Sequence, residues 1–293
     1  MQFTGTGVAI ITPFLNDKTV DFDALKRIVN HCIVGQIDYI VVLGTTGESV
    51  TLNAGEKTDI VRCVVDTAGG RVQVVVGVGG NDTAKVVDEI GRTNFDGISG
   101  LLSQTPYYNK PVQTGLMEHF KAVAAASPVP VILYNVPSRT GVNMTAETTL
   151  TLAREVENIV AIKEASGNLV QMMQIINGRP ENFSVISGDD AISLPLMSVG
   201  GQGVISVVAN AFPREISTII RSAAKNDFIA SRTAHYALLN LIETLFVEGS
   251  PSGIKAALKI LGLSQNILRL PLVPVSQNTY QKMESIIQKL KRS

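Results

Sequence analysis

A lysine stands at the end of an apolar run in the stretch IVAIKEASG, residues 159–167. The run Ile159 to Ile162 is typical of a buried strand, and a small, polar turn follows Lys163. Burial removes water from a lysine and disfavours its ammonium form, so the neutral amine becomes available to attack a ketone and form an imine. The alternative is a lysine that caps the strand and pairs with a nearby carboxylate. The pattern therefore makes Lys163 a candidate nucleophile.

Three other strand ends carry polar groups that suit the same chemistry. Tyr134 follows the run VPVIL one strand earlier, where its phenol could exchange protons with the amine or simply bond to the backbone. Thr45 and Thr46 lie in a glycine-flanked turn, whose hydroxyls and N–H groups suit a carboxylate, although turn formation alone also explains them. Arg139 follows Pro137 in a loop, free to grip a carboxylate or to remain solvated.

Other polar motifs do not indicate a nucleotide or metal site. The segment GVGGND, residues 77–82, ends in Asp where a dinucleotide-binding loop needs Gly or Ala. The segment SGDD, residues 187–190, would repel a phosphate, and no histidine clusters with its two carboxylates. We expect no metal, and we expect packing or surface roles for the three histidines, which are His31, His119 and His235.

Short runs rich in Val and Ile must position these residues, and most are nearly continuous, as in parallel strands covered on both faces. Helix-like segments separate them, including 21–35, 53–70, 81–93 and 145–156. The eight runs begin at residues 7, 38, 72, 97, 129, 159, 183 and 203. This alternation predicts an α/β fold, a (β/α)₈ TIM barrel over residues 1–225, with a doubly wound open sheet as the main alternative. In such barrels the chemistry lies where strands lead into helices.

The pattern changes after residue 225. The segment 226–293 predicts a C-terminal appendage of three helices with no strand between them, and LRLPLVPVS, residues 268–276, links the last two. We therefore expect two domains, a catalytic barrel and a small helical domain.

Composition narrows the class of protein. Of 293 residues 45% are hydrophobic, and 25 basic side chains balance 25 acidic ones, so neither a nucleic-acid binder nor an anionic-membrane binder is expected. Two cysteines without a C-x-x-C spacing favour a reducing compartment. Neither a secretory leader nor a membrane-spanning run is apparent, so we expect a cytoplasmic protein.

Five motifs resemble one enzyme family, the dihydrodipicolinate synthases, which are pyruvate-dependent class I aldolases. The motifs are GTTGES, TPYYNKP, YNVPSRTG, IKEASGN and GVISVVAN, and the likeness extends from GTGVAIITPF to LRLPLVPVS. The double threonine and the arginine of the third motif favour the synthases over related sugar-acid aldolases. N-acetylneuraminate lyase and 2-keto-3-deoxygluconate aldolase activities remain the alternatives.

The resemblance implies catalytic roles. Lys163 forms a Schiff base with pyruvate, and the resulting enamine attacks L-aspartate 4-semialdehyde before the substrate amine closes the ring and releases the lysine. Tyr134, Thr45 and Tyr108 form a proton relay, in which Tyr108 comes from a neighbouring subunit. A non-catalytic keto-acid sensor would be expected to have lost Lys163, Tyr134 or Thr45, yet all are present.

The resemblance also implies the binding residues. Thr45 and Thr46 hold the pyruvate carboxylate, Arg139 holds the semialdehyde carboxylate, and Gly188 and the carbonyl of Ile205 line the pocket. The family is commonly a homotetramer, a dimer of dimers. No cofactor is implied, because the lysine itself supplies the electron sink.

One group of positions departs from the family pattern. Many members are inhibited by lysine, and regulated members usually carry a glutamate where Lys85 stands and histidines at position 54 or 57. The matching allosteric positions here are Ser49, Val50, Ala54, Lys57, Asn81, Lys85 and Tyr107. Since a cation at position 85 repels the amine of the effector, we expect weak or absent feedback by lysine.

Overall fold

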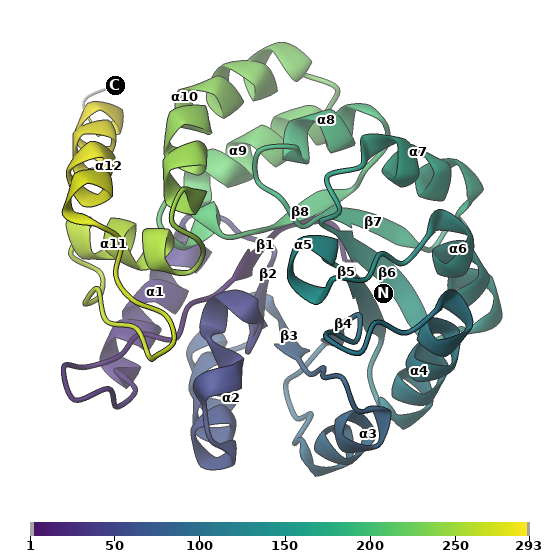
Figure 1. Ribbon diagram of the computed structural model, residues 1–293. Coiled ribbons are helices and arrows are strands. Elements are labelled where there is room, and N and C mark those ends of the chain that lie inside the picture. The colour runs from purple at the N-terminus through teal and green to yellow at the C-terminus, as the bar shows by residue number, and fades with distance from the viewer. Residues whose placement is uncertain (1–2, 292–293) are drawn as a thin grey trace.

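Eight parallel strands close into a barrel in the computed structural model, which describes residues 3–291 (Figure 1). Each strand pairs with the next along the chain, and β8 pairs with β1. The predicted TIM barrel is therefore confirmed and the open-sheet alternative is wrong. In order, the strands are β1 (Gly5–Ala9), β2 (Tyr39–Val42), β3 (Gln73–Gly77), β4 (Gly100–Gln104), β5 (Val131–Asn135), β6 (Ile159–Glu164), β7 (Ser184–Ser187) and β8 (Gly203–Ser206).

Helices between the strands form the outer layer, and the short helix α5 (Pro137–Thr140) follows β5. In Figure 1, α5 lies in front of the strands. The longer helices of this layer are α1 (Phe22–Val34), α2 (Ala54–Ala68), α3 (Thr83–Arg92), α4 (Gln113–Ala126), α6 (Ala146–Glu155), α7 (Leu169–Gly178), α8 (Ser193–Ser198) and α9 (Pro213–Ala224). Single-turn 3₁₀ helices lie at Thr45–Gly47, Ser49–Thr51 and Val208–Asn210.

Local sequence explains where several of these helices begin. Asp82 accepts hydrogen bonds from the N–H groups of Ala84 and Lys85 and so begins α3. Thr145 accepts from the N–H of Thr148 at the start of α6, as its position in the sequence predicts. Such caps satisfy backbone donors that the first helical turn leaves free.

Two apolar regions form the core. The larger one lies between the sheet and the helices, and a smaller one fills the barrel interior. Because side chains alternate along a strand, Ala161 of β6 belongs to the interior while Ile162 packs under the helices. The same alternation directs Lys163 inward and Glu164 outward.

Three helices follow the barrel: α10 (Phe228–Phe246), α11 (Ser252–Ile260) and α12 (Gln277–Leu290). Helix α10 packs against α9, and α12 packs against α10 and α11 on one flank of the barrel (Figure 1). The predicted three helices are present, while the division into two domains stays a prediction. Within residues 3–291, no helix combines the length and the apolar character needed to span a bilayer.

Candidate active site

Lys163 lies in β6 with its side chain inside the barrel, and only 5% of the residue is exposed. Its partner in the β5–β6 register is Tyr134, and the lysine Nζ lies 4.2 Å from the centre of the Tyr134 ring. Within residues 3–291, no carboxylate lies at ion-pair distance from Lys163. The alternative of a strand-capping lysine paired with a carboxylate is therefore not supported.

The space around the amine depends on Gly188, which directly follows β7. A Cβ atom added to Gly188 would lie 3.1 Å from Cε of Lys163 and 2.7 Å from Cβ of Ala165. Those distances are shorter than ordinary van der Waals contacts, so a larger residue at position 188 would displace the lysine. Ile205 of β8 is buried and belongs to the same interior cluster as Tyr134. The structure thus brings Lys163, Tyr134 and Gly188 together, and Ile205 belongs to the same barrel interior.

Thr45 and Thr46 lie in a 3₁₀ turn that follows β2. Thr45 is exposed and Thr46 is buried. The Oγ1 atom of Thr12 donates a hydrogen bond of 2.7 Å to the carbonyl of Gly47, which ties the turn to the segment after β1. Thr45 and Tyr134 both line a pocket of about 130 Å³, so the turn faces the same space as the phenol.

Arg139 is exposed in α5, beyond the strand that carries Tyr134. Its Nη2 atom donates a hydrogen bond of 3.3 Å to the carbonyl of Ser250 in the segment before α11. This contact leaves other guanidinium donors available for a carboxylate. Arg139 is thus an exposed cation beyond β5, separate from the buried amine, and its binding of a carboxylate stays a prediction.

A buried polar network, not identified from the sequence, holds the loop that carries Arg139. The carboxylate of Glu164 accepts hydrogen bonds from the Asn135 amide at 3.1 and 3.2 Å, from Gln171 Nε2 at 3.0 Å and from the Ser166 N–H at 2.7 Å. Asn135 also accepts from the Met144 N–H at 3.0 Å. Burial raises the pKa of Glu164, and these hydrogen bonds oppose that shift. A polar pair at the ends of adjacent apolar strands was the available sequence signal.

Of the two acidic residues after β7, Asp190 has a structural role. Asp190 is buried and accepts hydrogen bonds from the Ser206 hydroxyl and from the N–H groups of Val207 and Val208. Burial raises its pKa to about 6, while the hydrogen bonds act in the opposite direction. Asp190 therefore ties the ends of β7 and β8 together. Among the residues described, no group of three His, Cys, Asp or Glu side chains is placed to hold a metal ion.

Tyr108 lies apart from the other predicted catalytic residues. It is 87% exposed and has a φ of +73°, a backbone conformation that is uncommon for a residue with a Cβ atom. Its neighbour Tyr107 is only partly buried. The predicted relay from Tyr108 to Tyr134 thus remains a prediction that requires a second subunit.

The seven predicted allosteric positions lie in or shortly before α2 and α3, except for Tyr107, which follows β4. Ser49, Val50 and Lys57 line the pocket of about 130 Å³ beside Thr45. Lys57 Nζ lies 2.7 Å from the Glu89 carboxylate, and both residues also line a groove of about 670 Å³ that includes Ala54. The three remaining positions, Asn81, Lys85 and Tyr107, line neither space. The Lys85 side chain is 85% exposed and lies 3.4 Å from Asp82.

Comparisons with known proteins agree with this geometry. The model of the family described as "Dihydrodipicolinate synthetase family" matches residues 2–290. A curated relative from Parabacteroides distasonis, named 4-hydroxy-tetrahydrodipicolinate synthase, is 51% identical over 290 residues, covering 99% of this chain and 98% of the relative. A relative of the same name from Phocaeicola vulgatus is 50% identical, and the match covers 99% of this chain and 98% of the relative. A solved dihydrodipicolinate synthase from Aquifex aeolicus gives a TM-score of 0.95 at 42% identity, covering 99% of this chain and 98% of that one.

Proposed function

Because this chain belongs to the dihydrodipicolinate synthetase family, we propose that Lys163 carries its reaction, the condensation of pyruvate with L-aspartate 4-semialdehyde. The protein is a 4-hydroxy-tetrahydrodipicolinate synthase, a lyase of the class I aldolase type in lysine and diaminopimelate biosynthesis. The observation that supports Lys163 is its place inside the barrel mouth, with its amine over the Tyr134 ring and no carboxylate at ion-pair distance in the described chain.

Imine formation is the first step. The neutral amine of Lys163 attacks the keto carbon of pyruvate, and the carbinolamine then loses its hydroxyl as water to give the protonated imine. Tyr134, whose ring lies against the amine, supplies the proton that the departing hydroxyl needs. Thr45 and Tyr108 would return that proton through the relay.

Carbon–carbon bond formation follows. The positively charged imine draws electrons from the neighbouring C–H bond. The pyruvate methyl group therefore loses a proton, and the imine becomes an enamine. The enamine carbon attacks the aldehyde carbon of the semialdehyde, and the aldehyde oxygen takes up a proton to become the hydroxyl of the product. The substrate amine then attacks the imine carbon, closes the ring and displaces the Lys163 amine.

The rim residues would hold the two carboxylates. The turn Thr45–Gly47 presents hydroxyl and backbone donors to the pyruvate carboxylate, with Thr46 buried and Thr45 facing the pocket. Arg139 would pair with the carboxylate of the semialdehyde, which orients its aldehyde toward the enamine. Gly188 and the Ile205 carbonyl would leave room for pyruvate beside Lys163.

Assembly and location are part of the proposal. The exposed ring of Tyr108 would complete the relay in a neighbouring subunit, so we propose a tight dimer and, from the family, a homotetramer. We also propose a cytoplasmic enzyme with a barrel domain over residues 1–225 and a helical domain over residues 226–293. Sedimentation of the purified protein would test the oligomeric state.

Borohydride trapping tests the proposed nucleophile. Reduction of the enzyme in the presence of pyruvate should convert the imine into a stable amine on the peptide that contains Lys163. Lys255 is a suitable internal control, because it is also buried but pairs with Glu48. An adduct on Lys255, or none at all, would contradict the proposal. A Lys163→Met variant should fold and show no adduct.

Coupled assays test the substrate. Turnover should be seen with pyruvate and L-aspartate 4-semialdehyde. Cleavage of N-acetylneuraminate or of 2-keto-3-deoxygluconate at a higher kcat/KM would instead assign a related aldolase activity.

A further inference from the structure

A buried ion pair connects the C-terminal helices to the turn that carries Thr45 and Thr46. Lys255 of α11 and Glu48 directly after the turn face each other, and both side chains are completely buried. The second carboxylate oxygen of Glu48 accepts a hydrogen bond of 3.1 Å from the Arg269 N–H. Both partners of Glu48 thus belong to the segment that follows the barrel.

Glu48 has a constrained backbone as well as a constrained side chain. Its φ of +54° places it in the left-handed region, between two 3₁₀ turns. Its N–H donates to the Thr45 carbonyl at 3.1 Å, and its carbonyl accepts from the Thr51 N–H at 2.9 Å. Since such a conformation persists only where surrounding contacts enforce it, the buried carboxylate acts as the anchor of the turn.

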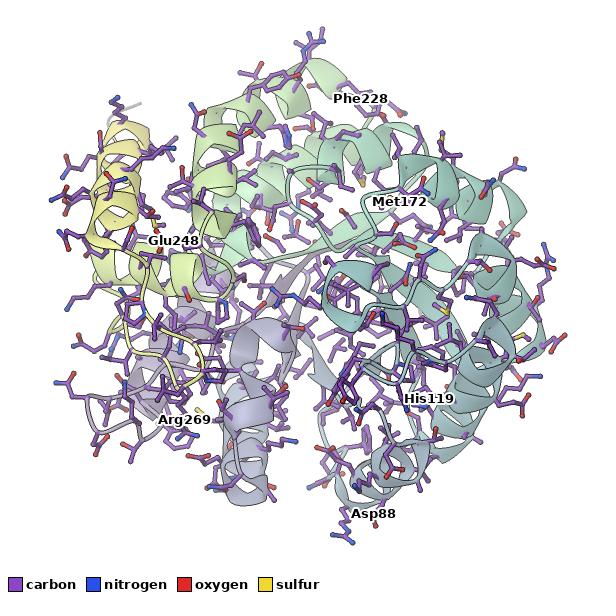
Figure 2. All side chains as sticks on the ribbon, viewed as in Figure 1. Asp88, His119, Met172, Phe228, Glu248 and Arg269 are labelled. Atoms are coloured by element: carbon purple, nitrogen blue, oxygen red, sulfur yellow. The ribbon has the colours of Figure 1, made fainter. Side chains whose placement is uncertain are left out.

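Lys255 is fixed from three directions. Its Nζ atom donates to the Ile267 carbonyl at 2.9 Å, faces Glu48 and lies 4.1 Å from the centre of the Phe14 ring. The Arg269 guanidinium lies over the same ring and is bonded to Glu56 of α2 at 2.8 Å. In Figure 2, Arg269 of the C-terminal segment lies beside α2. Lys255 is therefore held by Ile267 and Phe14 as well as by Glu48.

The same segment also contacts the other predicted binding loop. Arg139 donates to the carbonyl of Ser250, five residues before Lys255 along the chain. Two groups are assigned to carboxylate binding, the threonine turn and Arg139. Both are thus connected to the region around α11, the turn through Glu48 and Arg139 through Ser250. A buried ion pair adds little net stability compared with apolar residues of similar size, so stability alone does not explain a pair at this position.

We propose that Lys255 is a positioning residue for the keto-acid site, which acts by holding Glu48 and with it the donors of the turn Thr45–Gly47. This inference rests on the proposed function. Lys255 itself touches no substrate. The C-terminal helical segment is consequently part of the pyruvate-binding apparatus, although it supplies none of its donors.

Two variants test the proposal. Lys255→Met removes the charge at similar length, and Lys255→Met combined with Glu48→Gln removes both charges and leaves no unpaired carboxylate in the core. Each should raise KM for pyruvate by about ten- to a hundredfold, because small displacements of binding groups have effects of that size. KM for the semialdehyde should change much less, whereas kcat should also fall, because Thr45 belongs to the proposed relay. If the single variant fails to fold, the neutral double variant provides the measurement.

A matched control separates positioning from stability. Glu248→Gln weakens another C-terminal contact, in which the Glu248 carboxylate accepts from the N–H and hydroxyl of Ser276 at 2.9 and 2.6 Å (Figure 2). This variant should lower Tm without changing KM for pyruvate. A double variant with the wild-type KM for pyruvate would overturn the proposal, as would an equal rise in KM for Glu248→Gln. Failure of wild-type trapping on Lys163 would instead overturn the proposed function.

Discussion

Lys163 and Tyr134 are paired residues on adjacent strands, with the lysine Nζ 4.2 Å from the centre of the phenol ring. A ring face at this distance attracts a cation and fixes the position of the amine. In the proposed mechanism, this pairing would place the phenol beside the carbon that becomes bonded to the lysine. The proposed proton donor and the proposed nucleophile are thus positioned by the strand register of a closed sheet.

Removal of the Tyr134 hydroxyl should separate these two contributions. Tyr134→Phe keeps the ring over Lys163 but loses the proton-transfer group, so kcat should fall by about 10²- to 10⁴-fold. Borohydride trapping on Lys163 should become slower without disappearing. Single-turnover kinetics with pyruvate alone would measure the effect. Turnover close to that of the wild type would exclude the hydroxyl from proton transfer.

Gly188→Ala should displace the nucleophile. The new Cβ would lie 3.1 Å from Cε of Lys163, so the lysine must shift and kcat/KM should fall at least about tenfold. The free energy of unfolding should fall by about 1–3 kcal/mol, as is typical of overpacked cores. Gly91→Ala in α3 is the control, because a Cβ there meets nothing within 4 Å and should stabilise the protein by about 0.5–1 kcal/mol. Urea unfolding and steady-state kinetics on both variants would decide, and an unimpaired Gly188→Ala enzyme would contradict the assignment.

Asn135→Leu should destabilise the loop that carries Arg139. The change removes two hydrogen bonds from the buried Glu164 carboxylate and should reduce the free energy of unfolding by about 2–4 kcal/mol. KM for the semialdehyde should rise more than KM for pyruvate, since Arg139 loses its support. Thr145→Ala removes the cap of α6 nearby and should cost about 1 kcal/mol with both KM values unchanged. Equal effects on the two KM values would argue against a role of this network in binding the semialdehyde.

Free lysine should be a poor inhibitor. The Lys85 side chain is exposed and lies 3.4 Å from Asp82, and Lys57 is bonded to Glu89, so two cations occupy positions that the family resemblance assigns to the effector site. Like charges about 4 Å apart repel by about 1 kcal/mol in water and by more when partly buried. Lys85→Glu reverses the charge and should bind lysine more tightly than the wild type in calorimetry. Inhibition of the wild-type enzyme by sub-millimolar lysine would refute the prediction.

Acid should destabilise the protein partly through His119, which is buried on α4 (Figure 2). Its Nδ1 lies 2.9 Å from the Thr83 hydroxyl, and burial lowers its pKa to about 4 from an ordinary value near 6.5. Since the unfolded chain binds the proton first, this stabilisation is complete above pH 6.5 and is lost as pH falls toward 4. The loss should amount to about 1–3 kcal/mol.

Asp190 and Glu164 have raised pKa values, so acidification increases the free energy of unfolding through these two groups. The His119 contribution must therefore be measured as the difference in stability between the wild type and a His119 variant. His119→Leu cannot accept the proton in either state. Urea unfolding at pH 7 and at about pH 4.5 should show a smaller stability gap between wild type and variant at the lower pH. A gap that does not change with pH would contradict the assigned protonation state.

The sequence allowed the barrel and the buried lysine to be predicted because both follow from local patterns. A continuous apolar run that ends in Lys163 specifies a covered strand, and alternation of side chains directs the lysine inward. Strand ends were less well predicted. The run that begins at residue 97 enters the sheet only at Gly100, because Gly97 has a φ of +76° and Ile98 packs outside the strand.

Contacts between distant segments could not be predicted in the same way. Lys255 belongs to an amphipathic helix and Glu48 to a turn, and nothing in either local pattern specifies that two charges will be buried against each other. The same holds for the joint action of Asn135, Glu164 and Gln171. Charged pairs of this kind depend on the closure of the barrel and on the docking of α11.

The donor and acceptor halves of the reaction occupy parts of the fold with different freedom to change. Lys163, the proposed nucleophile, is part of a barrel strand, whereas Arg139, the proposed contact of the semialdehyde carboxylate, lies on a surface segment outside the strands. Grafting of this segment, residues 136–143, from another aldolase should exchange the acceptor while Lys163 and its proposed relay stay intact. Closure of the sheet thus makes the scaffold modular: new electrophiles can be recruited without rebuilding the chemistry of the enamine.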